Sequence, residues 1–301
     1  MRPFVRMWLK ACDNGDPPKR QQRAITPQLL RHMYERSGCG TDNEKHDSEA
    51  AIVAEVAIVA YFFAMRSCEI TATPTPGRTK ITRLRGVIFR DQANRELDHN
   101  TGDLTTARRV TVTFENQKNG LKNDRRTHEK TGDLVMCPVL RLASLVQRIL
   151  RIMPLAGPDT PVSTTCGGTE PTTIKAETLR MHLRLACTLG GGKAVFGYSA
   201  SVIGTRSIRS GAAMGLFLMN HPVAKIMILG RWSSDAFLDY IRPQVLEWTN
   251  QMSADMIRHD SFFDASDDRR DSRDDPRARR LKPVTTTDGG KKNASKLHLH
   301  H

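Results

Sequence analysis

Residues 204–243 read GTRSIRSGAAMGLFLMNHPVAKIMILGRWSSDAFLDYIRP and contain several side chains that could act on a phosphate group. Arg206 and Arg209 open a stretch of small residues, and Trp232 and Tyr240 lie toward its end. An arginine guanidinium can bind two phosphate oxygens at once, and a tyrosine hydroxyl can act as a nucleophile. The alternative interpretation of Tyr240 is a buried aromatic side chain on a helix face, and the rest of the chain has to decide between the two.

Two positions earlier in the chain fit the same chemistry. Arg66 follows an apolar stretch in AMRSCEI, and Glu69 could orient its guanidinium toward a phosphate. The local sequence by itself favours a structural Arg–Glu pair that caps a helix. Lys118 lies in FENQKNG, a turn between two predicted strands. It is either a solvated turn lysine or a proton donor to a leaving alkoxide.

A long apolar helix must precede Arg66. The stretch 50–65 is apolar except for Glu55, and it is shorter than a membrane span requires, so we expect a buried helix that ends near Arg66. Thr41 and Glu44 form a capping-box pattern ahead of it.

Local start and stop signals predict the other helices. Thr26 is a candidate cap, Pro27 suits the first helical position, and Gly38 is a stop signal. Similar signals and apolar periodicity predict further helices at about 138–153, 173–188, 207–219, 222–229, 234–241 and 244–259.

The region between the helices has the pattern of strands. Residues 81–91 and 108–117 are rich in β-branched side chains, and Val110, Val112 and Phe114 alternate with polar residues. KNGLKND has turn chemistry, and RRTHEK could form a third short strand. The sequence therefore predicts a small three-stranded antiparallel sheet near 81–130 in a mainly helical chain.

The composition indicates a polyanionic partner. The 301 residues include 46 Lys and Arg against 32 Asp and Glu, which gives a net charge of +14 and a pI near 9.9. Such an excess suits nucleic acid or an acidic membrane surface.

The six cysteines lie far apart, without the pairs or histidine spacing of a zinc site. We interpret them as reduced thiols of an intracellular protein, and the sequence supports no metal site.

The two ends of the chain differ from its middle. Residues 13–24 are polar and contain proline, which is typical of a linker, and the residues before them are too few for a domain. From about residue 264 the chain has almost no apolar side chains, so we expect a disordered tail. The charges of this tail nearly balance, and the positive excess therefore falls in the folded part.

The order of these motifs resembles the catalytic domain of the tyrosine recombinases, the phage-integrase family. The motifs are, in order, R-x-x-E after a helix, a lysine on a β-hairpin, R-x-x-R-S-G, and LGRWSSDAFLDYIR. The resemblance covers about residues 24–258. Residues 204–242 are especially similar to recombinases carried by eukaryotic mobile elements.

The resemblance implies a role for each candidate residue. Tyr240 would be the nucleophile, and Arg66 and Arg209 would clamp the scissile phosphate. Lys118 would protonate the 5′-oxygen, and Trp232 would occupy the His-or-Trp position that supports the phosphate. A covalent tyrosyl phosphate conserves the energy of the broken bond, so the reaction implies no cofactor.

Three features depart from the family pattern. Arg206 stands where most members have histidine or lysine, and arginine cannot accept a proton. Trp232 precedes Tyr240 by eight residues, one fewer than the spacing in many integrases. The helical N-terminal module that clamps DNA from the other side is nearly absent.

We therefore expect an α+β recombinase catalytic domain at residues 24–262. Residues 1–23 would be the remnant of an N-terminal DNA-binding module with its linker, and residues 263–301 the charged tail. The expected activity is DNA strand cleavage and rejoining in site-specific recombination or integration, and the alternative is a DNA-binding relic of a mobile element that no longer cleaves. The expected partner is double-stranded DNA, with a homo-oligomer on that DNA and no membrane association. The expected location is intracellular, and the nucleus in a eukaryotic host.

Overall fold

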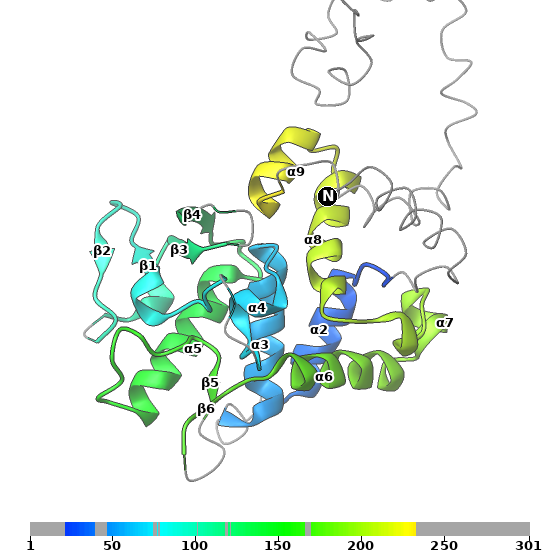
Figure 1. Ribbon diagram of the computed structural model, residues 1–301, viewed down its shortest axis with the longest axis horizontal. Coiled ribbons are helices and arrows are strands. Elements are labelled where there is room, and N and C mark those ends of the chain that lie inside the picture. The colour runs from blue at the N-terminus through cyan, green and yellow to red at the C-terminus, as the bar shows by residue number, and fades with distance from the viewer. Residues whose placement is uncertain are drawn as a thin grey trace, which may run out of the picture.

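The computed structural model of the protein describes residues 22–39, 47–74, 77, 79–100, 102–117, 120, 122–165 and 170–232 (Figure 1). Helices predominate, and one small antiparallel sheet interrupts them, which confirms the predicted fold class. The helices are α2 (Pro27–Arg36), α3 (Glu49–Phe62), α4 (Ser67–Ile70), α5 (Pro138–Ile152), α6 (Ala176–Leu189), α7 (Gly192–Phe196), α8 (Arg206–Leu218) and α9 (Val223–Gly230). The strands are β1 (Val87–Arg90), β2 (Glu96–Leu97), β3 (Arg109–Asn116), β4 (Lys122–Glu129), β5 (Thr164–Thr165) and β6 (Thr172–Thr173), and single helical turns form η2 (Leu84–Gly86), η3 (Leu104–Thr106) and η4 (Ala200–Val202).

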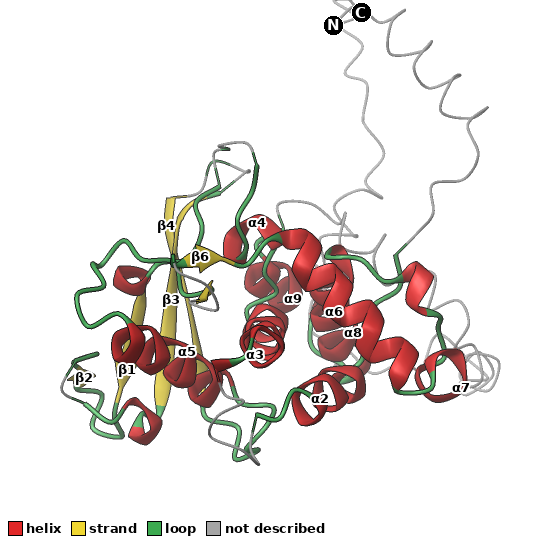
Figure 2. Ribbon diagram, turned by 90° about the horizontal axis from the view of Figure 1, so that it is seen from below, coloured by secondary structure: helices red, strands yellow, loops and turns green. Residues whose placement is uncertain are grey.

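Helix α3 is the centre of the arrangement. It packs against α2, α5, α6 and α8, while α5 also contacts β3 and β4. Figure 2 shows the sheet and α5 on one side of α3, with α2, α6 and α8 gathered on the other side. Within the described ranges, none of the helices combines the length and the apolarity that crossing a membrane requires.

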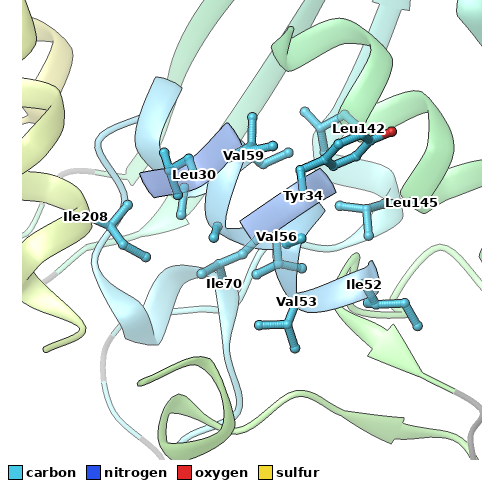
Figure 3. Close-up of a cluster of buried hydrophobic side chains, with 14 of the residues drawn as sticks. Leu30, Tyr34, Ile52, Val53, Val56, Val59, Ile70, Leu142, Leu145 and Ile208 are labelled. Atoms are coloured by element: carbon cyan, nitrogen blue, oxygen red, sulfur yellow. The ribbon is translucent and has the colours of Figure 1, made fainter. Parts of the chain in front are cut away.

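The core forms around α3 because that helix is apolar on every face. Every residue from Ala51 to Ala60 is buried, and side chains from α2, α5 and α8 close over it (Figure 3). Leu30 of α2, Leu142 of α5 and Ile208 of α8 are among these side chains. Full burial of one such side chain is worth about 1.5–3 kcal/mol. Helix α3 is therefore a fixed platform for the chain that leaves its C-terminal end.

The one charged residue inside this platform is compensated from α5. Glu55 is fully buried, and it accepts hydrogen bonds from Arg148 and, at 3.4 Å, from Arg141. A buried carboxylate without partners would cost several kcal/mol, so α5 has to present both guanidinium groups at this point. The pair fixes the register of α5 along α3 and, through α5, the position of the sheet.

Two predicted helix limits are revised. Helix α3 begins at Glu49, where the Ser48 hydroxyl accepts the Ala51 N–H at 3.2 Å, and the Thr41–Glu44 pattern lies outside the described residues. Helix α3 also ends earlier than predicted, at Phe62, because Ala64 adopts a left-handed conformation with φ 45°.

The helices predicted at about 173–188, 207–219 and 222–229 are confirmed as α6, α8 and α9. The starts predicted from Thr26 with Pro27 and from Pro138 are confirmed, because these residues cap or begin α2 and α5. The predicted helices at 234–241 and 244–259 lie outside the described residues.

The chain that enters α2 runs beside the start of α8. The Arg23 N–H donates to the Val202 carbonyl and the Ile25 N–H to the Ser207 carbonyl, both at 3.1 Å. A Cβ at Gly211 would overlap the Ile25 carbonyl oxygen, so only glycine permits this approach. The small residues of RSIRSGAA thus allow the N-terminal segment to pack directly on the helix that carries the candidate arginines.

The main sheet has four strands in the order β2-β1-β3-β4, one more than predicted. The additional strand β2 has only two residues, which is too short for an alternating pattern to reveal it. A tight turn brings it back onto β1: Asn94 is left-handed with φ 64°, and the Asp91 carboxylate accepts the Arg95 N–H at 2.9 Å. The separate pair β5–β6 was not predicted either, because its strands also have only two residues each.

The edge strand β4 is polar on the face that it turns toward the interior. Its Asp124, Arg126 and His128 pair with Phe114, Val112 and Val110 of β3, whose side chains are buried. Inward-facing charges on an edge strand discourage pairing with another chain. Here they also contact helix ends, where backbone carbonyl groups need donors. The polar face of β4 therefore has a docking role inside the fold.

His128 illustrates this role. Its ring lies edge-on to Phe63, with ring centroids 4.6 Å apart, and also contacts Phe62. Burial lowers the pKa of His128 to about 4, and a hydrogen bond with the backbone of Phe62 opposes this shift only in part. The imidazole is thus neutral in the folded protein at neutral pH.

We expect acid to destabilise the protein through His128. The unfolded chain binds a proton here near the ordinary pKa of about 6.5, whereas the folded protein does so only near pH 4. The contribution of His128 to the free energy of unfolding is therefore fully present above pH 6.5 and falls as the pH drops toward 4. About 2–3 kcal/mol of it is lost at pH 4.5. Urea unfolding at pH 7.5 and 4.5 measures it. His128→Phe should reduce the loss by this amount, while replacement of the exposed His221 by Phe should not; equal losses in wild type and His128→Phe would contradict the assignment.

Candidate active site

Arg66 and Glu69 form the pair that the sequence suggested. Arg66 caps the short helix α4: its backbone N–H donates to Glu69 Oε2 at 2.8 Å and its Nη1 to Oε1 at 2.9 Å. The Glu69 side chain is fully buried, whereas 25% of the Arg66 side chain is exposed. The structural pair therefore exists, and it also holds one guanidinium at the protein surface in a defined orientation.

A residue that the sequence analysis did not single out completes this arrangement. The Arg231 side chain is fully buried, and its Nη2 donates to Glu69 Oε2 at 2.7 Å. The same guanidinium donates to the carbonyls of Phe63 at 2.8 Å and Ala64 at 3.2 Å, the two residues that directly follow α3. It lies 3.7 Å from the centre of the Phe114 ring. Arg231 directly follows α9. Its side chain therefore links the end of that helix to α4, to β3 and to the residues after α3.

The charge state of Arg231 follows from these contacts. Burial lowers the pKa of Arg231 below the ordinary value for arginine, and Glu69 opposes that shift. An arginine does not lose its proton in proteins, so Arg231 is a buried cation. Its backbone is left-handed with φ 58°, a conformation that is unfavourable for a residue with a Cβ. The contacts of the side chain hold it in this conformation.

The C-terminal end of α9 collects three arginines. The last carbonyls of a helix have no partners within it and carry the negative end of the helix dipole. Three successive carbonyls accept from three guanidinium groups: Ile228 from Arg126 Nε at 3.0 Å, Leu229 from Arg231 Nη1 at 3.2 Å, and Gly230 from Arg209 Nη2. This helix end therefore brings side chains from β4 and α8 to one place.

Arg209 and Trp232 pack against each other beside this end. The Arg209 guanidinium lies 4.4 Å from the centre of the indole ring, and Arg209 is only 5% exposed. The backbone N–H of Trp232 donates to the Met227 carbonyl at 3.0 Å, and this bond anchors the turn after α9. A guanidinium has five donors in a fixed plane, so a carbonyl and a stacked ring can orient it for a planar anion.

Arg206 lies at the first position of α8 and is exposed. Its backbone N–H donates to Gln22 Oε1 at 3.2 Å, so a side chain from the entering segment binds one of the donors at this helix start. Arg206 and Arg209 are three residues apart on one helix, which places them on neighbouring positions of its surface. Arg206 faces solvent, while Arg209 is buried.

The structure thus brings four of the predicted site residues to one network. Arg66, Glu69, Arg209 and Trp232 are linked through Arg231 and its neighbour Gly230, and Arg206 lies one turn from Arg209 on α8. Lys118 and Tyr240 lie outside the described residues. No cluster of His, Cys, Asp or Glu that could hold a metal ion occurs in the part of the chain that is described.

Among the described residues, the network holds more positive than negative charge. Its arginines are Arg66, Arg126, Arg209 and Arg231, and the described carboxylates that pair within it are those of Glu69 and Asp124. Desolvated arginine groups of this kind bind phosphate or carboxylate oxygens through charge-assisted hydrogen bonds. The arrangement is suited to stabilising negative charge that develops on an oxyanion.

Two signals in the sequence could have revealed the missed residues. Arg231 lies inside the motif LGRW, directly before Trp232, so it was adjacent to a residue already singled out. Asp124, Arg126 and His128 alternate along KNDRRTHEK in the same two-residue period as the apolar positions of the neighbouring strand.

Comparisons with known proteins give distant likenesses. No family model matches the chain, and no curated protein matches it. One similar solved structure is a fragment of the Tn1549 transposon integrase in complex with circular intermediate DNA, at a TM-score of 0.39 and 13% identity, over 77% of this chain and 68% of that chain. Another contains a variant of the same integrase with a circular intermediate DNA, at a TM-score of 0.37 and 12% identity, over 77% and 67%. The roles of the residues in this chain therefore have to be argued from its own side chains.

We expect Gly230→Ala to disturb the packing of Trp232 on Arg209. A Cβ at Gly230 would overlap the indole ring, so the ring has to move away. Overpacking of this kind costs about 1–3 kcal/mol. Thermal unfolding and tryptophan fluorescence measure the change. Gly157→Ala is the matched control, because a Cβ there meets nothing within 4 Å; similar results for the two variants would show that the Trp232 contact is loose.

Proposed function

We propose that this protein cleaves and rejoins strands of double-stranded DNA through a 3′-phosphotyrosine intermediate, in site-specific recombination or integration of a mobile element. The observation that carries the proposal is the joining of Arg66 and Arg209 by one buried network. These arginines lie far apart in the sequence, Arg66 at the N-cap of α4 and Arg209 in α8. Glu69, Arg231 and the Gly230 carbonyl connect them. A phosphate clamp requires two guanidinium groups that are fixed relative to each other.

The chemistry follows from the proposed roles. The Tyr240 hydroxyl loses its proton to water, and its oxygen attacks the phosphorus. A P–O bond forms to tyrosine, and the bond to the 5′-oxygen breaks. Arg66 and Arg209 stabilise the charge on the non-bridging oxygens, and Lys118 gives its proton to the departing 5′-oxygen. A free 5′-hydroxyl then attacks the phosphotyrosine in the reverse sense, which rejoins the strand without ATP.

The surroundings of the two arginines suit a division of labour. Arg209 is almost fully buried and held by Gly230 and Trp232, so it is preorganised before DNA arrives. Arg66 is held on one side by Glu69, and a phosphate can reach the exposed part of its side chain. Preorganised donors cost no reorganisation when charge develops in the transition state. Trp232 would act by holding Arg209 in place.

We expect Tyr240→Phe to abolish covalent protein–DNA adducts and to leave DNA affinity nearly unchanged, because only the hydroxyl is lost. Adducts are trapped on a nicked substrate from which the cleaved fragment diffuses away, and they are resolved by denaturing electrophoresis. Arg209→Lys keeps the charge but not the planar fork, so adducts should form about 10²–10³-fold more slowly. Tyr34→Phe, in the core, is the matched control and should retain wild-type trapping. Adducts in Tyr240→Phe would exclude Tyr240 as the nucleophile.

Arg206 is expected to limit the rate. A free tyrosine titrates near pH 10, and an arginine cannot take its proton, whereas a neutral imidazole can do so near pH 7. Because Arg206 is exposed, a histidine fits there without repacking. Arg206→His should therefore speed cleavage by up to about 10²-fold, most clearly below pH 8. Single-turnover rates between pH 6 and 9 measure this. Slower cleavage in Arg206→His would indicate that Arg206 instead donates to the phosphate.

A further inference from the structure

A chain of polar contacts connects the β3–β4 hairpin to the end of α9. Arg126 Nε donates to the Ile228 carbonyl at 3.0 Å, and Arg126 Nη1 donates to Asp124 Oδ1. Asp124 Oδ2 accepts from Gln117 Nε2 at 3.2 Å. Gln117 is fully buried and directly follows β3. The contacts therefore run from α9, across the inner face of β4, to the end of β3, where the turn of the hairpin begins.

Each member of this chain has a reason to be where it is. Asp124 and Arg126 are two residues apart on β4, so both point to the inner face of the sheet. Their side chains are only 18% and 19% exposed, and two charges with so little solvent have to pair. Gln117 then satisfies the second carboxylate oxygen. An apolar residue at position 126 would leave the Asp124 carboxylate and the Ile228 carbonyl without this donor.

Arginine is required at this position for a geometric reason. Its guanidinium donates through Nε to one partner and through Nη1 to another in a single rigid plane. The Ile228 carbonyl is thereby held at a defined position relative to the Asp124 carboxylate. A lysine has a single nitrogen on a flexible stem and cannot hold both partners in one plane.

The same helix end also holds the proposed phosphate clamp. Ile228 accepts from Arg126, and Gly230, two residues later, accepts from Arg209. The hairpin and the clamp are thus attached to two carbonyls of one helix that lie two residues apart. A rotation of this helix end would move both together.

We infer that Gln117, Asp124 and Arg126 form a positioning relay, which fixes the end of β3, where the turn of the hairpin begins, to the C-terminus of α9 and so aligns the general acid with the phosphate clamp. Lys118 is the residue after Gln117 in the sequence. The catalytic part of this inference rests on the proposed function, in which Lys118 protonates the 5′-oxygen; the coupling of the hairpin to α9 does not. The three residues are positioning residues and do not touch the substrate themselves.

A substrate with sulfur in place of the bridging 5′-oxygen tests the catalytic part. A thiolate leaves without a proton, because thiols titrate near 8.5, far below an alcohol. On ordinary DNA, Arg126→Met should cleave up to about 10²-fold more slowly, the effect of a misplaced catalytic group. On the sulfur-bridged DNA this defect, like that of Lys118→Ala, should largely disappear, while the defect of Arg209→Lys should remain. Rates are measured at saturating DNA.

The matched control is Arg125→Met, because Arg125 is an exposed neighbour on the outer face of the same strand. It should cleave both substrates at wild-type rates. An equal defect of Arg126→Met on both substrates would overturn the alignment of the general acid. Rescue by Arg126→Lys to wild-type rates would overturn the need for a planar fork.

Amide hydrogen exchange without DNA tests the coupling itself and requires no activity. Arg126→Met should raise the exchange rates of residues 114–117 and 228–232 together, and Arg125→Met should not. Unchanged exchange in Arg126→Met would overturn the relay. If the wild-type protein cleaves neither substrate but Arg126→Met shows the coupled exchange, the proposed function fails while the relay stands. The two failures are therefore distinguishable.

Discussion

The buried ion pair between Arg231 and Glu69 is the contact on which the rest of the site depends. Both side chains are fully buried, so neither charge has water to replace a lost partner. Removing one member of such a pair typically costs about 3–5 kcal/mol. The Arg231 guanidinium also donates to the carbonyls of Phe63 and Ala64, which directly follow α3, and to that of Leu229 in α9. A single guanidinium thereby ties the central helix to α4, which carries Arg66, and to the turn after α9.

This tie explains how a strongly basic chain can concentrate arginines in a small volume. Each guanidinium of the network has a carbonyl or carboxylate partner: Glu69 for Arg66, the Ile228 carbonyl for Arg126, and the Gly230 carbonyl for Arg209. Helix ends supply these acceptors without adding negative charge, so the network stays positive overall. A phosphate completes such an arrangement, because its oxygens accept several charge-assisted hydrogen bonds at once.

Features that depend on neighbours in the sequence could be predicted from the sequence. Thr26 with Pro27 starts α2, and alternating Val110, Val112 and Phe114 line the buried face of β3. The Arg66–Glu69 pair is also local, because three residues span one helical turn. These are short-range interactions, in which spacing along the chain sets the distance in space. The mainly helical class with a small sheet follows from them.

The tertiary structure decided which side chains reach the carbonyl groups at helix ends. Nothing near Arg231 in the sequence indicates that its partners are Glu69 and the end of α3, and nothing near Arg126 points to Ile228. Every helix has unsatisfied carbonyls at its end, and they become specific acceptors only after α3 has packed and has placed those ends beside β4 and α8. The sequence therefore determined the candidate arginines and the elements that carry them. Packing around α3 determined which carbonyl each arginine binds, because a hydrogen bond between distant segments requires both of them to be held in place by the core.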